Sequence, residues 1–219
     1  MFDIFTKTGL IEFIFTLPAL LISLTIHEWA HSYTAYKLGD KSQKALGRLS
    51  LDPIAHIDPF GFICIALFGF GWGKPVIIDD RNFKNRTKGN MLVSLAGPLS
   101  NILMAIFCTL ILKALLALGI VNFSYPTIVS PSSIIGRMFL LTIGFNIVFA
   151  IFNMIPIPPF DGSKVLFYFL PGKFKEIMYT LERYSFVIIL VLLVTNIASY
   201  IISPIVSWIY TMLMYLLFL

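Results

Sequence analysis

The pentapeptide HEWAH, from His27 to His31, lies at the end of an apolar stretch that begins near Gly9. Ionisable side chains in a hydrocarbon environment each cost roughly 2.5 kcal/mol or more unless a partner compensates them. Residues four apart lie on one face of a helix, so His27 and His31 can bind one metal ion together. In H-E-x-x-H zinc sites the glutamate, here Glu28, is a general base that takes a proton from the zinc-bound water. HEWAH therefore predicts a zinc site. The alternative is a chance string on a helix whose polar side faces a pore.

A third zinc ligand should come from elsewhere in the chain, because zinc hydrolases usually combine three protein ligands with one water. The candidates at matching depth are His56, Asp58 and Asp161. Asp161 is favoured because it belongs to NMIPIPPFDG (residues 153–162), directly after an apolar span. The prolines there break the helix and can turn the carboxylate back toward the other spans.

The composition predicts a membrane protein. Of the 219 residues 58% are hydrophobic and only 12% are charged, which is more apolar surface than a water-soluble fold buries. The net charge of +5 does not indicate a nucleic-acid partner, because most basic residues flank the apolar spans. Cytoplasmic loops have this charge pattern under the positive-inside rule. We therefore expect a multi-pass protein of the cell membrane, with its active site toward the cytoplasmic face.

The apolar segments give a coarse topology, since a span needs about 20 predominantly apolar residues. A final stretch is too long for one crossing, and Ser203-Pro204 offers a break that would give two short spans. Residues 60–72 are too few to span and contain glycines, which favours a re-entrant or interfacial element. The apolar segments are residues 9–36, 91–120, 138–157 and 185–219.

The predicted fold is an all-α polytopic membrane protein with about five to six transmembrane helices. A short re-entrant or β-like element lies between the first and second spans. We expect a single membrane-embedded domain over residues 1–219, with a core at about 10–170 and a C-terminal helical hairpin at about 184–219.

HEWAH together with NMIPIPPFDG resembles the site-2 protease family of intramembrane zinc metalloproteases. The pattern of that family is H-E-x-x-H followed by N-x-x-P-x-P-x-x-D-G, and every fixed position is matched. SLAGPLSN (residues 94–101) resembles the A-G-P-x-x-N element of the second core span, and FGWGKP (residues 70–75) resembles the glycine-containing re-entrant strand region. The resemblance covers about residues 15–170 and indicates a compact bacterial-type form without an appended PDZ or CBS domain.

The resemblance implies one zinc ion per chain, held by His27, His31 and Asp161, with Glu28 as the general base. It also implies that Asn153 positions substrate or stabilises an oxyanion. The alternative for Asn153 is a helix-breaking amide that satisfies carbonyls freed by Pro156. The implied activity is hydrolysis of peptide bonds within or near the transmembrane segments of single-span membrane proteins or signal-peptide remnants in the lipid bilayer.

Two other functions remain open at this stage. A membrane-embedded zinc protease of the prenyl-protein-processing type would explain HEWAH but not NMIPIPPFDG. An inactive relative that binds membrane proteins would keep the motifs without cleavage.

Several segments also carry alternative interpretations. The element Ala96-Gly97-Pro98 with Asn101 predicts close helix packing, because its residues are small, and a kink at the proline. The alternative is a direct role of Asn101 near the site. His56 and Asp58 predict an interfacial turn more than an accessory ligand or proton route. Residues 69–79 suggest an extended segment whose exposed edge could pair with an unwound substrate.

Overall fold

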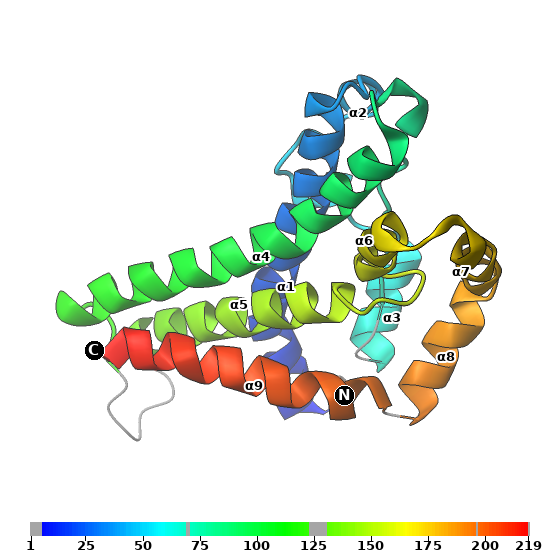
Figure 1. Cartoon of the computed structure of the whole chain (residues 1–219). Helices are drawn as coiled ribbons and strands as arrows, with labels where there is room; N and C mark the ends of the chain where they lie inside the picture. Colours follow the sequence, from blue (N-terminus) through cyan, green and yellow to red (C-terminus); the bar gives the residue numbers. More distant parts are fainter. Residues whose placement is uncertain (1–5, 69–70, 123–130, 196, 219) are drawn as a thin grey trace.

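The computed structural model describes residues 6–68, 71–122, 131–195 and 197–218, which are mostly helical (Figure 1). The α-helices are α1 (Lys7–Lys37), α2 (Ser42–Ala45), α3 (Pro59–Phe68), α4 (Arg86–Ala117), α5 (Pro131–Asn153), α6 (Asp161–Phe169), α7 (Lys175–Arg183), α8 (Ser185–Thr195) and α9 (Ile197–Phe218). Short 3-10 helices are η1 (Pro53–Ala55), η2 (Asp80–Asn82) and η3 (Gly172–Phe174).

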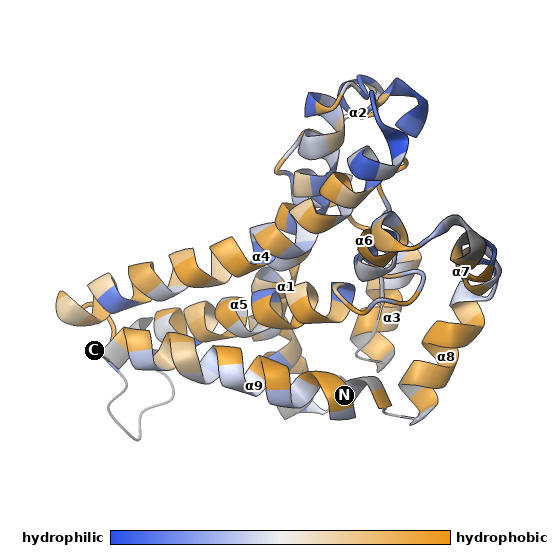
Figure 2. Cartoon of the chain, in the orientation of Figure 1, coloured by the Kyte–Doolittle hydropathy of each residue, from blue (hydrophilic) through white to orange (hydrophobic). Residues whose placement is uncertain are grey.

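Four helices within the described residues are long and apolar enough to cross a membrane. They lie in α1, α4, α5 and α9, over Gly9–Lys37, Arg86–Ala117, Ile134–Asn153 and Ser199–Leu217. The polar residues gather instead around α2 and the start of α4 (Figure 2). The mostly helical membrane fold expected from the composition is therefore confirmed.

The C-terminal apolar stretch divides at a different place from the one predicted. α8 ends at Thr195 and α9 begins at Ile197, and α9 continues through Pro204. The prediction of a break at Ser203-Pro204 was therefore wrong. α9 packs on α4 and α5, and such packing lets a membrane helix tolerate the hydrogen bond that proline removes. With 11 residues, α8 alone is shorter than the roughly 17 that a span requires.

The segment between the first two spans contains a short helix whose chain then folds back on itself. α3 occupies the apolar stretch, and Ile57 forms an isolated antiparallel bridge with Gly73. A side chain on Gly61 would clash with the backbone oxygen of Trp72, and one on Gly71 would clash with that of Gly61. Glycine is therefore required where the returning backbone crosses α3, and within the described residues the β-like feature is reduced to this single bridge.

The apolar core lies where α4, α5 and α9 run side by side (Figure 1). Its buried members are Ala105, Cys108, Leu112, Val121, Ile143, Ile147 and Leu217. α1 packs against both α4 and α5. This arrangement brings the polar residues of α1 against two other spans.

Candidate metal centre

His27, His31 and Asp161 come together inside the helix bundle. The two histidines lie four residues apart on α1 and are 4% and 7% exposed. Their Nε2 atoms are 2.9 Å apart, and each is 3.2 Å from the same Asp161 oxygen. Among the described residues these three form the one cluster of histidine, cysteine or acidic side chains that could hold a metal ion.

The hydrogen-bond partners of His27 fix which ring nitrogen carries its proton. The Asn101 amide nitrogen donates to Ser23 O at 2.9 Å and to Asn146 Oδ1 at 2.8 Å. Asn101 Oδ1 is therefore the acceptor in its 2.6 Å contact with His27 Nδ1. The Nδ1 atom of His27 must therefore donate. In the neutral imidazole this leaves Nε2 unprotonated, with a lone pair that can bind a cation.

His31 has the same tautomer for a simpler reason. Its Nδ1 lies 2.7 Å from Val93 O, and a backbone carbonyl can only accept. Three electron-pair donors thus face one another at 2.9–3.2 Å without a proton between them when the histidines are neutral. A metal ion at its centre would bind all three donors.

The spacings fit zinc. A tetrahedral zinc with bonds of about 2.0–2.1 Å holds its ligand atoms roughly 3.3 Å apart, close to the separations in this cluster. Two imidazoles and one carboxylate are also a ligand set of catalytic zinc sites that leave a fourth position for water. Glu28 is half-buried next to His27 and lies within electrostatic reach of His31.

A proline-rich turn carries Asp161 back to the histidines. α5 ends at Asn153, and α6 begins at Asp161 itself. Within the turn Phe160 packs edge-to-face on Phe152, with ring centroids 4.6 Å apart. A side chain on Gly162 would clash with the backbone of Met154, so glycine allows α6 to start close to the end of α5. The expectation that these prolines turn the carboxylate inward agrees with this geometry.

A scan of family models matches residues 15–195 to Peptidase family M50. The chain belongs to peptidase family M50. This is the site-2 protease family indicated by the two motifs, and its members use zinc.

Similar proteins carry corresponding names. The protein named "Putative zinc metalloprotease YwhC" from Bacillus subtilis is 38% identical over 188 residues, covering 86% of this chain and 84% of its own. Rip2 from Mycolicibacterium smegmatis, with the same description, is 30% identical over 190 residues, covering 84% of this chain and 68% of its own. MJ0611 from Methanocaldococcus jannaschii, again so described, is 30% identical and covers 72% of each chain. No solved structure matches the chain.

The position of Gly97 explains why small residues occupy this part of α4. A side chain at Gly97 would clash with the imidazole rings of both His27 and His31. The close packing predicted from Ala96-Gly97-Pro98 is present, and what packs there is the pair of candidate ligands. α4 continues through Pro98.

Asn146 is a site residue that sequence reasoning missed. It is fully buried on α5, and its amide nitrogen donates to Ser23 Oγ and Thr142 O, both at 2.8 Å. Through Asn101 it therefore supports His27. The available signal was an asparagine in the middle of an apolar span, because polar groups at that depth usually have a partner.

The remaining residues singled out from the sequence lie in local hydrogen bonds outside the cluster. His56 is fully buried with Nε2 2.7 Å from Ser50 O, and Asp58 accepts from Gly61 N at 2.7 Å at the start of α3. These contacts agree with the predicted interfacial turn. Asn153 donates to Phe149 O at 3.0 Å in its own helix.

We predict that Gly97→Ala weakens metal binding, because the added methyl group must displace one imidazole. Zinc content after dialysis against a graded chelator series should fall at chelator concentrations that the wild type withstands. Gly144→Ala is the matched control, since its nearest neighbour would be 3.9 Å away. Equal zinc retention by all three proteins would contradict the packing of Gly97 on the ligands.

Proposed function

We propose that this chain is an intramembrane zinc endopeptidase with His27, His31 and Asp161 as the ligands of one zinc ion. Its substrates are single-span membrane proteins or signal-peptide remnants, cut within or near their transmembrane segments. The convergence of two imidazoles and a carboxylate inside a bundle of apolar helices carries the proposal. Membership of family M50 supports it.

Bound at these residues, zinc supplies a water with a pKa of about 7 and polarises the carbonyl of the substrate. Glu28 takes a proton from the attacking water and later delivers it to the leaving amine. The contacts of Asn101 and Val93 with the Nδ1 atoms would leave the Nε2 atoms of both histidines free to hold the ion. Asp161 supplies the negative charge of the ligand set.

Asn153 has a proposed second role in this reaction. Its amide lies at the end of α5, half-buried, at the start of the turn that leads to Asp161. Rotation away from Phe149 O would let it donate to the oxygen that becomes negative during attack, where water is scarce. In the present rotamer it bonds its own helix, as the alternative interpretation predicted.

Substrate helices must unwind before cleavage, because a helical peptide bond hides its carbonyl. Targets with helix-weakening residues in their spans are therefore favoured. An unwound substrate can pair with the backbone around Val76 and Ile78. This backbone is neither helical nor part of a turn, and both residues are half-buried.

The proposed orientation places the active site toward the cytoplasm. The polar end of the molecule in Figure 2 carries the basic residues between the first two spans. Under the positive-inside rule this end is cytoplasmic, and water would reach the site from there. We further propose that α3 and its return segment form the re-entrant element. With α8 they would complete a membrane part of five to six helical elements.

The two alternative functions differ from this proposal in testable ways. Prenyl-protein processing does not account for NMIPIPPFDG, and the family match includes that motif. An inactive relative would bind membrane proteins without cutting them. Cleavage of a model substrate by purified protein separates this alternative from proteolysis.

We predict that Glu28→Gln reduces cleavage by about 10²–10⁴-fold, the usual contribution of a general base. Wild type and variant in liposomes would receive a single-span substrate with glycines in its span, and mass spectrometry would identify the products. Zinc content should be unchanged, because Glu28 is not a ligand. Glu12→Gln, which alters an exposed residue paired with Arg137, is the matched control. Equal cleavage by Glu28→Gln and wild type would refute the assigned role.

Asp161→Ala should abolish cleavage and weaken zinc binding by more than about 100-fold, since even loss of a partner behind a ligand costs 10–100-fold. Asp58→Ala should retain zinc, because Asp58 lies at the start of α3 and outside the cluster. Competition with a fluorescent zinc chelator measures both affinities. Wild-type zinc affinity in Asp161→Ala would require a different third ligand, such as His56 or Asp58.

A further inference from the structure

The short helix α7 has an apolar side that is largely exposed. Phe174, Ile177, Leu181 and Tyr184 follow one another at spacings of three and four residues, which places them along one side of a helix. Of these, Phe174, Ile177 and Tyr184 are 40%, 55% and 55% exposed. We call these four residues the apolar side of α7.

The opposite side of α7 lines a cavity of about 520 Å³. Met178, Tyr179 and Glu182 belong to its walls, and so does Ser163 on α6, two residues after Asp161. The cavity therefore lies next to the part of α6 that begins at the metal centre. α7 separates this cavity from whatever covers its apolar side.

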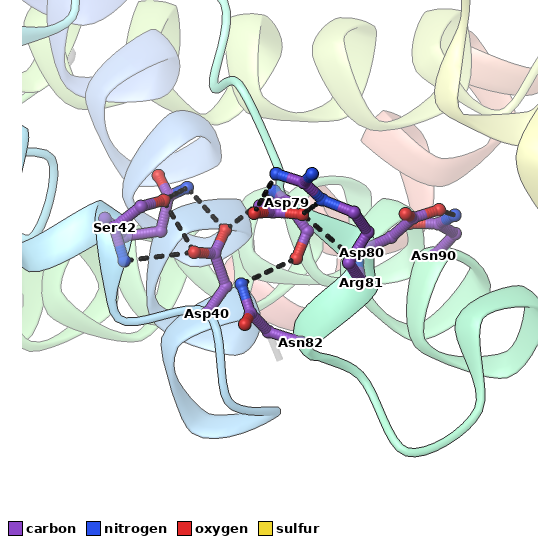
Figure 3. A network of polar contacts seen from close by, with 8 residues as sticks. Asp40, Ser42, Asp79, Asp80, Arg81, Asn82 and Asn90 are labelled. Atoms are coloured by element: carbon purple, nitrogen blue, oxygen red, sulfur yellow. Dashed lines mark hydrogen bonds and ion pairs between the residues drawn. The ribbon is translucent and has the colours of Figure 1, made fainter.

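Another wall of the same cavity is fixed by hydrogen bonds. Asp80 accepts from Asn90 Nδ2 at 2.9 Å, and Figure 3 shows the two side chains next to each other. The neighbouring residue Asp79 donates its N–H to Asp40 at 3.0 Å. α7, in contrast, packs mainly on η3, α6 and α8, which are its neighbours along the chain. The helix bundle thus gives α7 little support, and its position depends on what covers the exposed side.

α8 indicates how deep α7 lies in the membrane. Figure 1 shows α8 leading from α7 to the start of α9, and Figure 2 shows it as hydrophobic over most of its length. A helix that is apolar all round is stable in hydrocarbon and not in water. α7 comes directly before it and has one apolar and one polar side, so it lies at the boundary between hydrocarbon and water. The exposed side chains of α8 include Phe186, Val187, Leu190, Val191 and Val194.

The charges of this part of the chain favour anionic lipid. Basic residues outnumber acidic residues by four to two over residues 162–184. Anionic phospholipids give the cytoplasmic leaflet a negative surface potential that attracts basic segments next to a membrane. The basic residues are Lys164, Lys173, Lys175 and Arg183, and the acidic residues are Glu176 and Glu182.

We propose that α7 lies on the surface of the cytoplasmic leaflet and binds anionic phospholipids. Its apolar side enters the lipid layer, while the opposite side forms a wall of the cavity next to α6. Lipid thus supplies the support that the helix bundle does not give. The choice of leaflet rests on the orientation proposed above, whereas lipid binding by α7 requires no proteolytic activity.

Nitroxide labels at Ile177 and Tyr179 test this arrangement. The two residues are two positions apart on α7 and therefore point to nearly opposite sides. Their side chains are 55% and 61% exposed, so neither label has to displace the core. Each residue in turn is replaced by p-acetylphenylalanine and coupled to a hydroxylamine nitroxide, which leaves Cys64 and Cys108 unmodified. The purified protein is placed in phosphatidylcholine nanodiscs with or without phosphatidylglycerol.

With phosphatidylglycerol, the label at Ile177 should collide more often with oxygen, which concentrates in lipid, than with a water-soluble nickel chelate. The label at Tyr179 should show the reverse. Equal oxygen-to-nickel collision ratios at the two positions would overturn the proposal. Because no step requires cleavage, the expected asymmetry in a protein that cuts no substrate would uphold the proposal and refute the proposed protease function.

The lipid class is tested by removing charge. Each basic residue near an anionic surface contributes roughly fivefold to attachment. The double variant Lys173→Gln with Lys175→Gln should therefore lower the collision ratio at Ile177 toward its value without phosphatidylglycerol. Lys84→Gln with Lys88→Gln, which removes the same charge from exposed residues before and within the first turn of α4, is the matched control. An equal effect of both pairs, or a ratio independent of phosphatidylglycerol, would refute anionic lipid as the partner.

Discussion

Three electron-pair donors meet in a largely buried space, and when both imidazoles are neutral no proton lies between them. His27 and His31 have already committed their Nδ1 protons to Asn101 and Val93. Without a cation the facing nitrogens and the Asp161 carboxylate would repel one another, and in low dielectric that cost is large. The helices that surround the cluster position these three donors so that one cation can bind all of them.

Each nearby element supplies one part of the site. α1 provides the two imidazoles by helical spacing alone, and α4 provides both a carbonyl and the empty space at Gly97. α5 provides Asn146, whose amide joins α1 and α4 through Ser23 and Asn101. Hydrogen bonds between membrane helices are among the forces that associate them in lipid. The same chain of hydrogen-bonded amides thus holds three spans together and orients His27, a candidate ligand.

The sequence predicted the parts of the site that are local or carried by a family motif. His27 and His31 follow from helical spacing, and Asp161 from its motif and its proline-rich turn. Asn146 and Gly97 act through partners many residues distant, and their roles depend on helix packing that periodicity does not specify. Pro204 was misread as a helix end because packing of α9 on α4 and α5 outweighs its local preference.

X-ray absorption at the zinc edge of the purified protein in lipid tests the metal centre most directly. The predicted spectrum shows one zinc per chain with nitrogen and oxygen ligands at about 2.0–2.1 Å and the multiple scattering of two imidazoles. Asp161→Ala should remove one light-atom ligand and keep both imidazoles. A sulfur ligand at about 2.3 Å, a third imidazole, or a spectrum unchanged by Asp161→Ala would contradict the assignment.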